Sequence, residues 1–297
     1  MNNDMAPGGL TFSLGGVRLS FQAAGSGIRL VGAPGYRDFI TSGSPDLTLQ
    51  VVAGPFPGQN LGAARFEASN WSLFSTSQGD VYRLRIAFPG PFVSVYTTLL
   101  FPDGRNGQIY IEDELGGQPP RTDVVCPPPA LDELLAVNLM ARQRGLLVHA
   151  CGLCLEDGTG LLFSGYSGSG KSTTARIWQQ AGAARLLSDE RVAVFRRSGQ
   201  FWMGGTPWHG DGLVSTPLEA PLQRLFILRH APANHARPLK PTQAVTALLE
   251  RAFLPFWDAL GMAFTLEFLQ DLCTQTPCYE LGFLPDESII EFVRCLS

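Results

Sequence analysis

Charged residues are scarce in this sequence, and lysine is the scarcest of them. Of 297 residues only 16% are charged, and the two lysines are Lys171 and Lys240. The net charge is −4, so we expect neither the basic face of a nucleic-acid-binding protein nor a nucleic-acid partner. Hydrophobic residues make up 45% of the chain, which is enough for a sizeable core and too many for a disordered protein.

The sequence also lacks a long apolar segment and a secretory signal. No run of about 18 apolar residues occurs without a charge, so we expect no transmembrane helix and no membrane partner. The N-terminus has neither a basic start nor an apolar run, so a signal peptide is not expected. The six cysteines are interpreted as reduced thiols of a cytoplasmic protein.

Residues 1–125 are expected to form a β-rich domain. Short apolar runs alternate there with Gly, Pro, Ser and Asp turns, a spacing typical of a small antiparallel sheet or sandwich. The expected strands cover residues 10–14, 17–21, 47–52, 71–74, 81–88, 92–101 and 108–111. No motif in this part points to chemistry, and substrate recognition is our hypothesis for its role.

Residues 126–297 are expected to form an α/β domain, and a loop rich in proline and polar residues at 116–129 marks its boundary with the first domain. Helical spacing of apolar residues predicts helices at 131–142, 171–181, 241–256 and 259–272. Apolar runs predict strands at 146–155, 160–163, 185–187, 192–195, 201–203 and 222–228. Strands that alternate with helices are typical of an α/β fold.

A glycine-rich loop at residues 165–172 carries the most specific signal in the chain. Its sequence, GYSGSGKS, matches the pattern G-x-x-x-x-G-K-[ST] at every fixed position. A strand that turns tightly into a helix aims backbone N–H groups and the positive end of the helix dipole at phosphate oxygens. We expect Lys171 to reach the β- and γ-phosphates of ATP and Ser172 to ligate Mg²⁺. The expected nucleotide-binding residues are Gly165, Ser167, Gly168, Ser169, Gly170, Lys171, Ser172 and Thr173.

Two acids, Asp189 and Glu190, follow the expected strand 185–187. Ligands of α/β proteins bind at such strand ends, and adjacent carboxylates in an apolar segment are costly unless solvated or bound to a cation. Phosphoryl transfer needs a second Mg²⁺ ligand or a base near the γ-phosphate. We therefore interpret Asp189 as base or metal ligand, with Glu190 as the competing choice and an ordinary surface turn as the alternative.

The histidines give weaker signals. His149 lies among apolar residues of an expected strand, where a lone histidine is more often a core residue than a functional one. His209 and Asp211 belong to the glycine-rich segment 204–212, which is as consistent with a substrate site as with an ordinary turn. His230 and His235 lie in a polar stretch and are expected to be solvated loop residues.

Several of these segments together resemble a known family. His149, the loop 165–172 and the segment LSDER at 187–191 follow the order and spacing of the HPr kinase/phosphorylase catalytic domain. Segments 131–135, 206–210 and 253–257 resemble the HPr-kinase-related proteins of bacterial biosynthetic clusters, some of which phosphorylate lasso-peptide precursors. The resemblance covers roughly residues 126–290. It implies an α/β P-loop kinase fold of the HPr kinase/phosphoenolpyruvate carboxykinase type.

The resemblance also implies roles for individual residues. His149, Lys171, Asp189 and Glu190 match catalytic positions, where one carboxylate helps to deprotonate the acceptor hydroxyl and a metal is bound nearby. Related kinases often form ring-like assemblies, which makes a homo-oligomer an expectation.

Two departures from the family pattern concern the substrate. Thr173 stands where the kinases of HPr commonly carry an acid. Their later glutamate-bearing signature has no clear counterpart, and Asp211 is the candidate substitute as metal ligand. These departures argue against HPr itself as the substrate and against the reverse phosphorolysis reaction.

The sequence thus predicts an ATP- and Mg²⁺-dependent kinase that acts on a hydroxyl of a peptide or protein, with serine the expected acceptor. One alternative is a nucleotide-binding sensor or assembly protein without transfer activity. A second is a P-loop NTPase that drives a partner by hydrolysis, although the sequence identifies no arginine finger for it.

Overall fold

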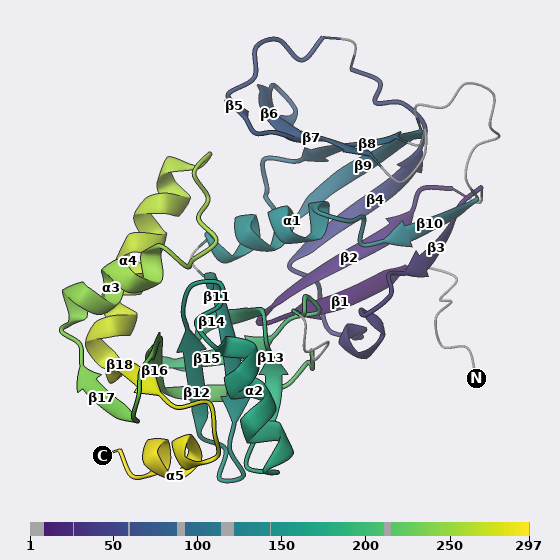
Figure 1. Ribbon diagram of the computed structural model, residues 1–297. Helices are drawn as coiled ribbons and strands as arrows, with labels where there is room; N and C mark the ends of the chain where they lie inside the picture. Colours follow the sequence, from purple (N-terminus) through teal and green to yellow (C-terminus); the bar gives the residue numbers. More distant parts are fainter. Residues whose placement is uncertain are drawn as a thin grey trace. The chain divides into compact units, whose positions relative to one another are not determined.

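The computed structural model of the protein describes residues 9–25, 27–58, 60–87, 93–113, 122–142, 144–210 and 215–296. The fold is mixed α/β, with large sheets and few helices (Figure 1). It divides into an N-terminal unit, Met1–Phe12 with Arg18–Ala136, and a C-terminal unit, Ser13–Val17 with Val137–Ser297. Helix α1 (Leu131–Met140) crosses the boundary between the two.

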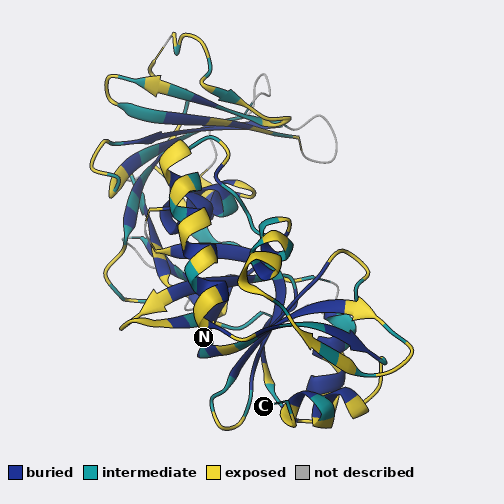
Figure 2. Cartoon of the chain, turned by 90° about the vertical axis from the view of Figure 1, so that its left-hand side faces the viewer, coloured by how far each residue is buried: buried dark blue, intermediate teal, exposed yellow. Residues whose placement is uncertain are grey.

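The N-terminal unit is built on an eight-stranded sheet of order β1-β2-β4-β9-β8-β7-β6-β5. The strands are β1 (Leu10–Leu14), β2 (Val17–Ala23), β4 (Leu47–Ala53), β5 (Phe66–Glu67), β6 (Trp71–Thr76), β7 (Gly79–Ala87), β8 (Val93–Leu100) and β9 (Asn106–Asp113). Alternate residues are buried along β1 and β4, as expected when one sheet face covers a core. Figure 2 colours the buried residues of the chain dark blue.

The expectation of a small antiparallel sheet is wrong in two respects. The sheet is large, and β4 pairs in parallel with both β2 and β9. These parallel pairs join segments far apart in sequence, whereas the spacing of apolar runs reports only on neighbours. The strands β3 (Arg29–Gly32), β5 and β10 (Asp123–Cys126) and the 3-10 turn Arg37–Phe39 were not predicted, because segments this short carry too few residues for a clear period.

Two long strands of the C-terminal unit, β11 (Gly145–Cys154) and β16 (Glu219–His230), each belong to two sheets. Their first halves form an antiparallel sheet with β14 (Arg191–Arg197) and β15 (Gln200–Gly205). Their second halves form a sheet that we call the β12 sheet, of order β13-β11-β12-β16-β18-β17. Its other strands are β12 (Gly160–Ser164), β13 (Arg185–Ser188), β17 (His235–Pro238) and β18 (Cys278–Phe283).

Helices cover both faces of the β12 sheet. On one face, Trp178 of α2 (Lys171–Gln180) and Ile289 of α5 (Ser288–Arg294) are fully buried in a core with Phe163 and Phe226. On the other face, Leu248 of α3 (Pro241–Leu249) and Leu269 of α4 (Ala259–Gln275) pack into a second core. β12 is therefore a central strand, buried over its whole length.

The helix expected at 241–256 ends at Leu249. The chain then runs extended beside β11, where Phe253 N–H donates to the Leu147 carbonyl at 2.9 Å and Val148 pairs with Ala252. This tertiary pairing, followed by Pro255, wins over the local helical pattern. The elements β17, β18 and α5 were not predicted. No helix among the described residues is long and apolar enough to cross a membrane.

Candidate nucleotide site

The glycine-rich loop lies between the central strand β12 and helix α2. β12 has β11 antiparallel on one side and β16 parallel on the other. Gly168 has φ +76° and Gly170, which caps α2, has φ +102°, a conformation that favours glycine. A Cβ on Gly165 would lie 2.2 Å from the Ser169 hydroxyl. The loop therefore needs its glycines to curl over the start of α2, where backbone N–H groups and the helix dipole favour an anion.

Lys171, the first residue of α2, is 6% exposed. Its ammonium donates to the carbonyls of Gly165 at 3.0 Å and Tyr166 at 3.2 Å. Burial lowers the pKa of Lys171, the charge of Glu190 opposes this, and the charge of Arg251 lowers the pKa further. An ammonium held this way loses solvation, so a polyphosphate would stabilise its charged form.

A cavity of about 360 Å³ opens over the loop. That volume suits a small ligand. Its wall is formed by His149, Ser167, Gly168, Gly170, Lys171, Ser172, Thr173, Glu190, Gly210 and His230. The structure thus brings together the start of α2 and two predicted catalytic side chains, His149 of strand β11 and Glu190 of the turn between β13 and β14. Gly165, Ser169 and Asp189 do not line this cavity.

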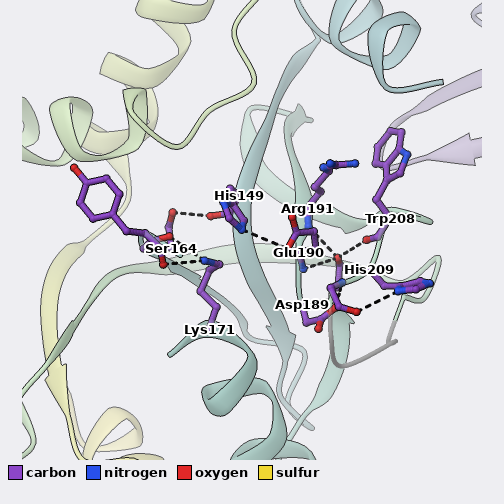
Figure 3. A network of polar contacts seen from close by, with 12 residues as sticks. His149, Ser164, Lys171, Asp189, Glu190, Arg191, Trp208 and His209 are labelled. Carbon is purple, nitrogen blue, oxygen red and sulfur yellow. Dashed lines mark hydrogen bonds and ion pairs between the residues drawn. The ribbon is translucent and has the colours of Figure 1, made fainter. Parts of the chain in front are cut away.

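His149 and Glu190 line the same cavity as the loop, and Figure 3 shows the contact between their side chains. The neighbouring strands β11 and β14 place the imidazole Nε2 3.4 Å from a carboxylate oxygen of Glu190. Burial lowers the pKa of His149, the charge of Lys171 lowers it further, and Glu190 partly opposes both. The imidazole is therefore neutral at neutral pH. The His149 and Glu190 side chains are each 31% exposed.

Asp189 occupies the tight turn between β13 and β14 and is 1% exposed. Its Oδ1 accepts a hydrogen bond from the Gly210 N–H at 2.9 Å. A Cβ on Gly210 would lie 3.2 Å from an oxygen of both Asp189 and Glu190, so glycine allows this close approach. The Ser188 hydroxyl ties the turn together by accepting from the Glu190 and Arg191 N–H groups at 3.2 Å. Asp189 thus lies directly behind Gly210, which lines the cavity.

The oxygen donors of the site suit Mg²⁺, which binds proteins through one or two carboxylates and keeps waters and phosphate oxygens as other ligands. Ser172 lines the cavity together with Glu190, and Asp189 adjoins it. Within the described ranges, no group of three or more His, Cys, Asp or Glu side chains could hold a metal ion. Asp211, the third predicted metal ligand, lies outside the described residues.

Two of the remaining histidines, His230 and His235, are exposed as predicted but belong to strands and not to a loop, since His230 ends β16 and His235 begins β17. His230 ends strand β16, and its Nε2 lies 2.7 Å from the Gly168 carbonyl. The loop part of the prediction is wrong for His230, because β16 extends two residues beyond the apolar run that marked it, and the part that predicts an exposed residue is confirmed. His209 is exposed, with its Nδ1 3.2 Å from the Gly210 carbonyl.

Sequence reasoning missed a cluster of three residues that contact one another. They are Tyr166 of the loop and Glu250 and Arg251, which follow helix α3. The Arg251 side chain is 3% exposed, and its guanidinium carbon lies 4.0 Å from the centroid of the Tyr166 ring. The Tyr166 hydroxyl donates to the Glu250 carboxylate. No motif marks these residues, since Glu250 and Arg251 stand in what looks like the middle of a helix. Its early end at Leu249 is a tertiary effect.

Comparison with models of known protein families and with curated protein sequences found no match.

Proposed function

We propose that the protein is a P-loop phosphotransferase that binds Mg·ATP in the cavity over residues 165–172. The observation that carries the proposal is the composition of the cavity wall. The start of α2, with Lys171 and Ser172, lines the same cavity of about 360 Å³ as His149 and Glu190. Phosphoryl transfer requires this pairing of a polyphosphate cradle with groups that can orient and deprotonate a nucleophile.

The loop side of the cavity would bind the nucleotide. The α2 N-terminus and the Lys171 ammonium neutralise the β- and γ-phosphates. The Ser172 hydroxyl and one carboxylate of the acid pair would hold Mg²⁺, which would supply positive charge to the phosphates. Binding replaces the two carbonyls that now accept from Lys171 with stronger, charged acceptors.

The opposite side would receive the acceptor hydroxyl. We assign the base to Asp189, because the Gly210 N–H holds its carboxylate in place and a fixed group needs little reorganisation during reaction. Asp189 does not line the cavity, so it would act on the hydroxyl through one bridging water. Glu190 and the neutral His149 line the cavity and orient the acceptor. Glu190 is the rival base, since its carboxylate is already on the wall.

The proposed fold type and acceptor class rest on the family resemblance. The order His149, loop, acid turn matches the HPr kinase/phosphorylase domain, and in this chain all three sit around one cavity. We accordingly propose a kinase fold of the HPr kinase/phosphoenolpyruvate carboxykinase type and a hydroxyl of a peptide or protein, serine first, as acceptor.

Incubation with γ-labelled ATP, Mg²⁺ and a panel of serine-, threonine- and tyrosine-containing peptides tests the proposal. We expect label on a peptide hydroxyl, serine above the others. Binding of ATP without label transfer or phosphate release would favour a nucleotide sensor. Release of labelled phosphate at the same rate with and without peptides would favour an NTPase, and either result would overturn the proposal.

A further inference from the structure

Arg251 is an unusual residue to find behind a phosphate-binding loop. Its side chain is 3% exposed, and burial of a guanidinium is costly unless its charge is well compensated. Nη1 donates to the Ala247 carbonyl and lies 3.4 Å from the Glu250 carboxylate, which is itself 50% exposed. These two contacts compensate the buried charge of Arg251 only weakly. A buried guanidinium at this position therefore suggests a role beyond stability.

The guanidinium holds one residue of the loop from behind. Its carbon lies 4.0 Å from the centre of the Tyr166 ring, a favourable cation–π distance. The same Glu250 carboxylate that contacts Arg251 also accepts from the Tyr166 hydroxyl. The ring is thus fixed on its face and at its tip, although Tyr166 is 50% exposed.

The backbone of Tyr166 carries this constraint into the nucleotide site. Its carbonyl accepts from the Ser169 N–H at 3.0 Å, which closes the turn of the loop, and from the Lys171 ammonium at 3.2 Å. Tyr166 is therefore the shared partner of the loop turn and of the phosphate-binding lysine. The charge of Arg251 also acts on Lys171 directly, since it is one cause of the lowered pKa of that lysine.

The other end of the same segment reaches the acceptor side. The backbone carbonyl of Arg251 accepts from the His149 N–H at 2.8 Å. Arg251 thus contacts His149 of strand β11 through its backbone and Tyr166 of the loop through its side chain. These two contacts join the two walls of the cavity.

We propose that Arg251 is a positioning residue of the nucleotide site, which clamps Tyr166 so that the loop turn and Lys171 are held ready for a polyphosphate. It does not line the cavity and acts only through other residues. The part of the inference that concerns nucleotide binding rests on the proposed function. The part that concerns the loop conformation does not.

The test compares Arg251→Met, Tyr166→Leu and the double variant with the unaltered full chain. Arg196→Met is the matched control. Arg196 also stacks on an aromatic ring, that of Phe201 at 4.7 Å, and bonds to Asp271 at 2.7 Å, but neither partner belongs to the loop. Amide hydrogen exchange of residues 165–172 is measured without nucleotide, and the affinity for Mg·ATP is measured by calorimetry.

We expect the Ser169 amide to exchange about tenfold faster in both single variants, as loss of one desolvated cation–π contact implies. The Kd for Mg·ATP should rise by a similar factor of about ten. The double variant should be no worse than the single ones, because both remove the same contact. Arg196→Met should change neither quantity, whatever it does to thermal stability.

Unchanged exchange of the loop in Arg251→Met and Tyr166→Leu would overturn the inference. So would a loss of thermal stability with exchange raised evenly across the C-terminal unit, since that result describes an ordinary core contact. If the unaltered protein binds no Mg·ATP, the proposed function fails, and the exchange experiment still decides whether Arg251 clamps the loop.

Discussion

The two units of this protein are both built on large sheets, and each has a cavity, yet only one of them suggests a chemistry. In the N-terminal unit a cavity of about 240 Å³ is lined by polar groups that include Arg83, Thr97 and Glu112. In the C-terminal unit the cavity of about 360 Å³ has the start of a helix in its wall, with Lys171 and Ser172 beside it. A cavity lined by charged residues does not by itself indicate a reaction. A loop whose backbone N–H groups suit a phosphate restricts the possible ligands far more.

The largest effect on phosphoryl transfer should come from Lys171, the residue of the C-terminal cavity that has no lysine counterpart in the cavity of the N-terminal unit. Lys171→Ala should lower phosphoryl transfer by about 10³-fold, as expected when a charge that stabilises the transition state is removed. The variant should stay folded, because alanine is a good helix former at this helix position. Label transfer from γ-labelled ATP and circular dichroism measure the two quantities.

Lys240→Ala is the matched control, because Lys240 is the only other lysine of the chain and caps helix α3. Its transfer rate should equal that of the unaltered protein. Equal losses in the two variants would remove the special role of Lys171.

Substitutions of Asp189 and Glu190 should have the next largest effect on catalysis and should show which of the two is the base. Asp189→Asn should lower kcat by about 10²-fold, the scale of general base catalysis. Glu190→Gln should cost about tenfold, because Glu190 is about a third exposed and water can partly replace an orienting group. Steady-state kinetics with a saturating acceptor peptide measure both values. The reverse order would assign the base to Glu190.

The cavity of the N-terminal unit should matter little for the nucleotide. Arg83 is exposed, and a substitution at an exposed site typically changes binding or stability by about twofold at most. Arg83→Met should therefore leave the Kd for Mg·ATP within about twofold, measured by calorimetry. A rise in the KM of the acceptor peptide alone would assign substrate recognition to this unit. A tenfold loss of nucleotide affinity would contradict the assignment of nucleotide binding to the C-terminal unit alone.

The smallest effect concerns the pH dependence of stability. The pKa of His149 lies below its usual 6.5, so between that lowered value and about pH 7 the unfolded chain binds more protons than the folded one. The contribution of His149 to stability is thus present above about pH 7 and is lost as the pH falls. His149→Gln should flatten this slope in urea unfolding at about pH 5.5 and 7.5. An unchanged slope would show that His149 is not the group responsible.

The contrast between the units also separates what sequence can predict from what it cannot. The loop at 165–172 and helix α2 were predictable, because glycine positions and a helix start are local features. So were strands β1 and β4, which lie within one residue of the predicted bounds 10–14 and 47–52. The parallel pairing of β4 with β2 and β9 was not, because it depends on segments far apart in the chain.

The same division holds inside the candidate site. The sequence marked His149, Lys171, Ser172 and Glu190, and in the fold all four line one cavity. It gave no sign of Arg251, since that residue matters only through the end of α3 at Leu249 and its approach to Tyr166. Contacts that need tertiary structure leave no local pattern to read.

Calorimetric titration of the folded protein with ATP and Mg²⁺ tests whether the loop at 165–172 binds a nucleotide. We expect saturable binding of one nucleotide per chain, at least tenfold weaker in Lys171→Ala and unchanged in Lys240→Ala. If the folded protein shows no binding of Mg·ATP or Mg·GTP at millimolar concentrations, the loop at 165–172 is not a phosphate site and the account is contradicted.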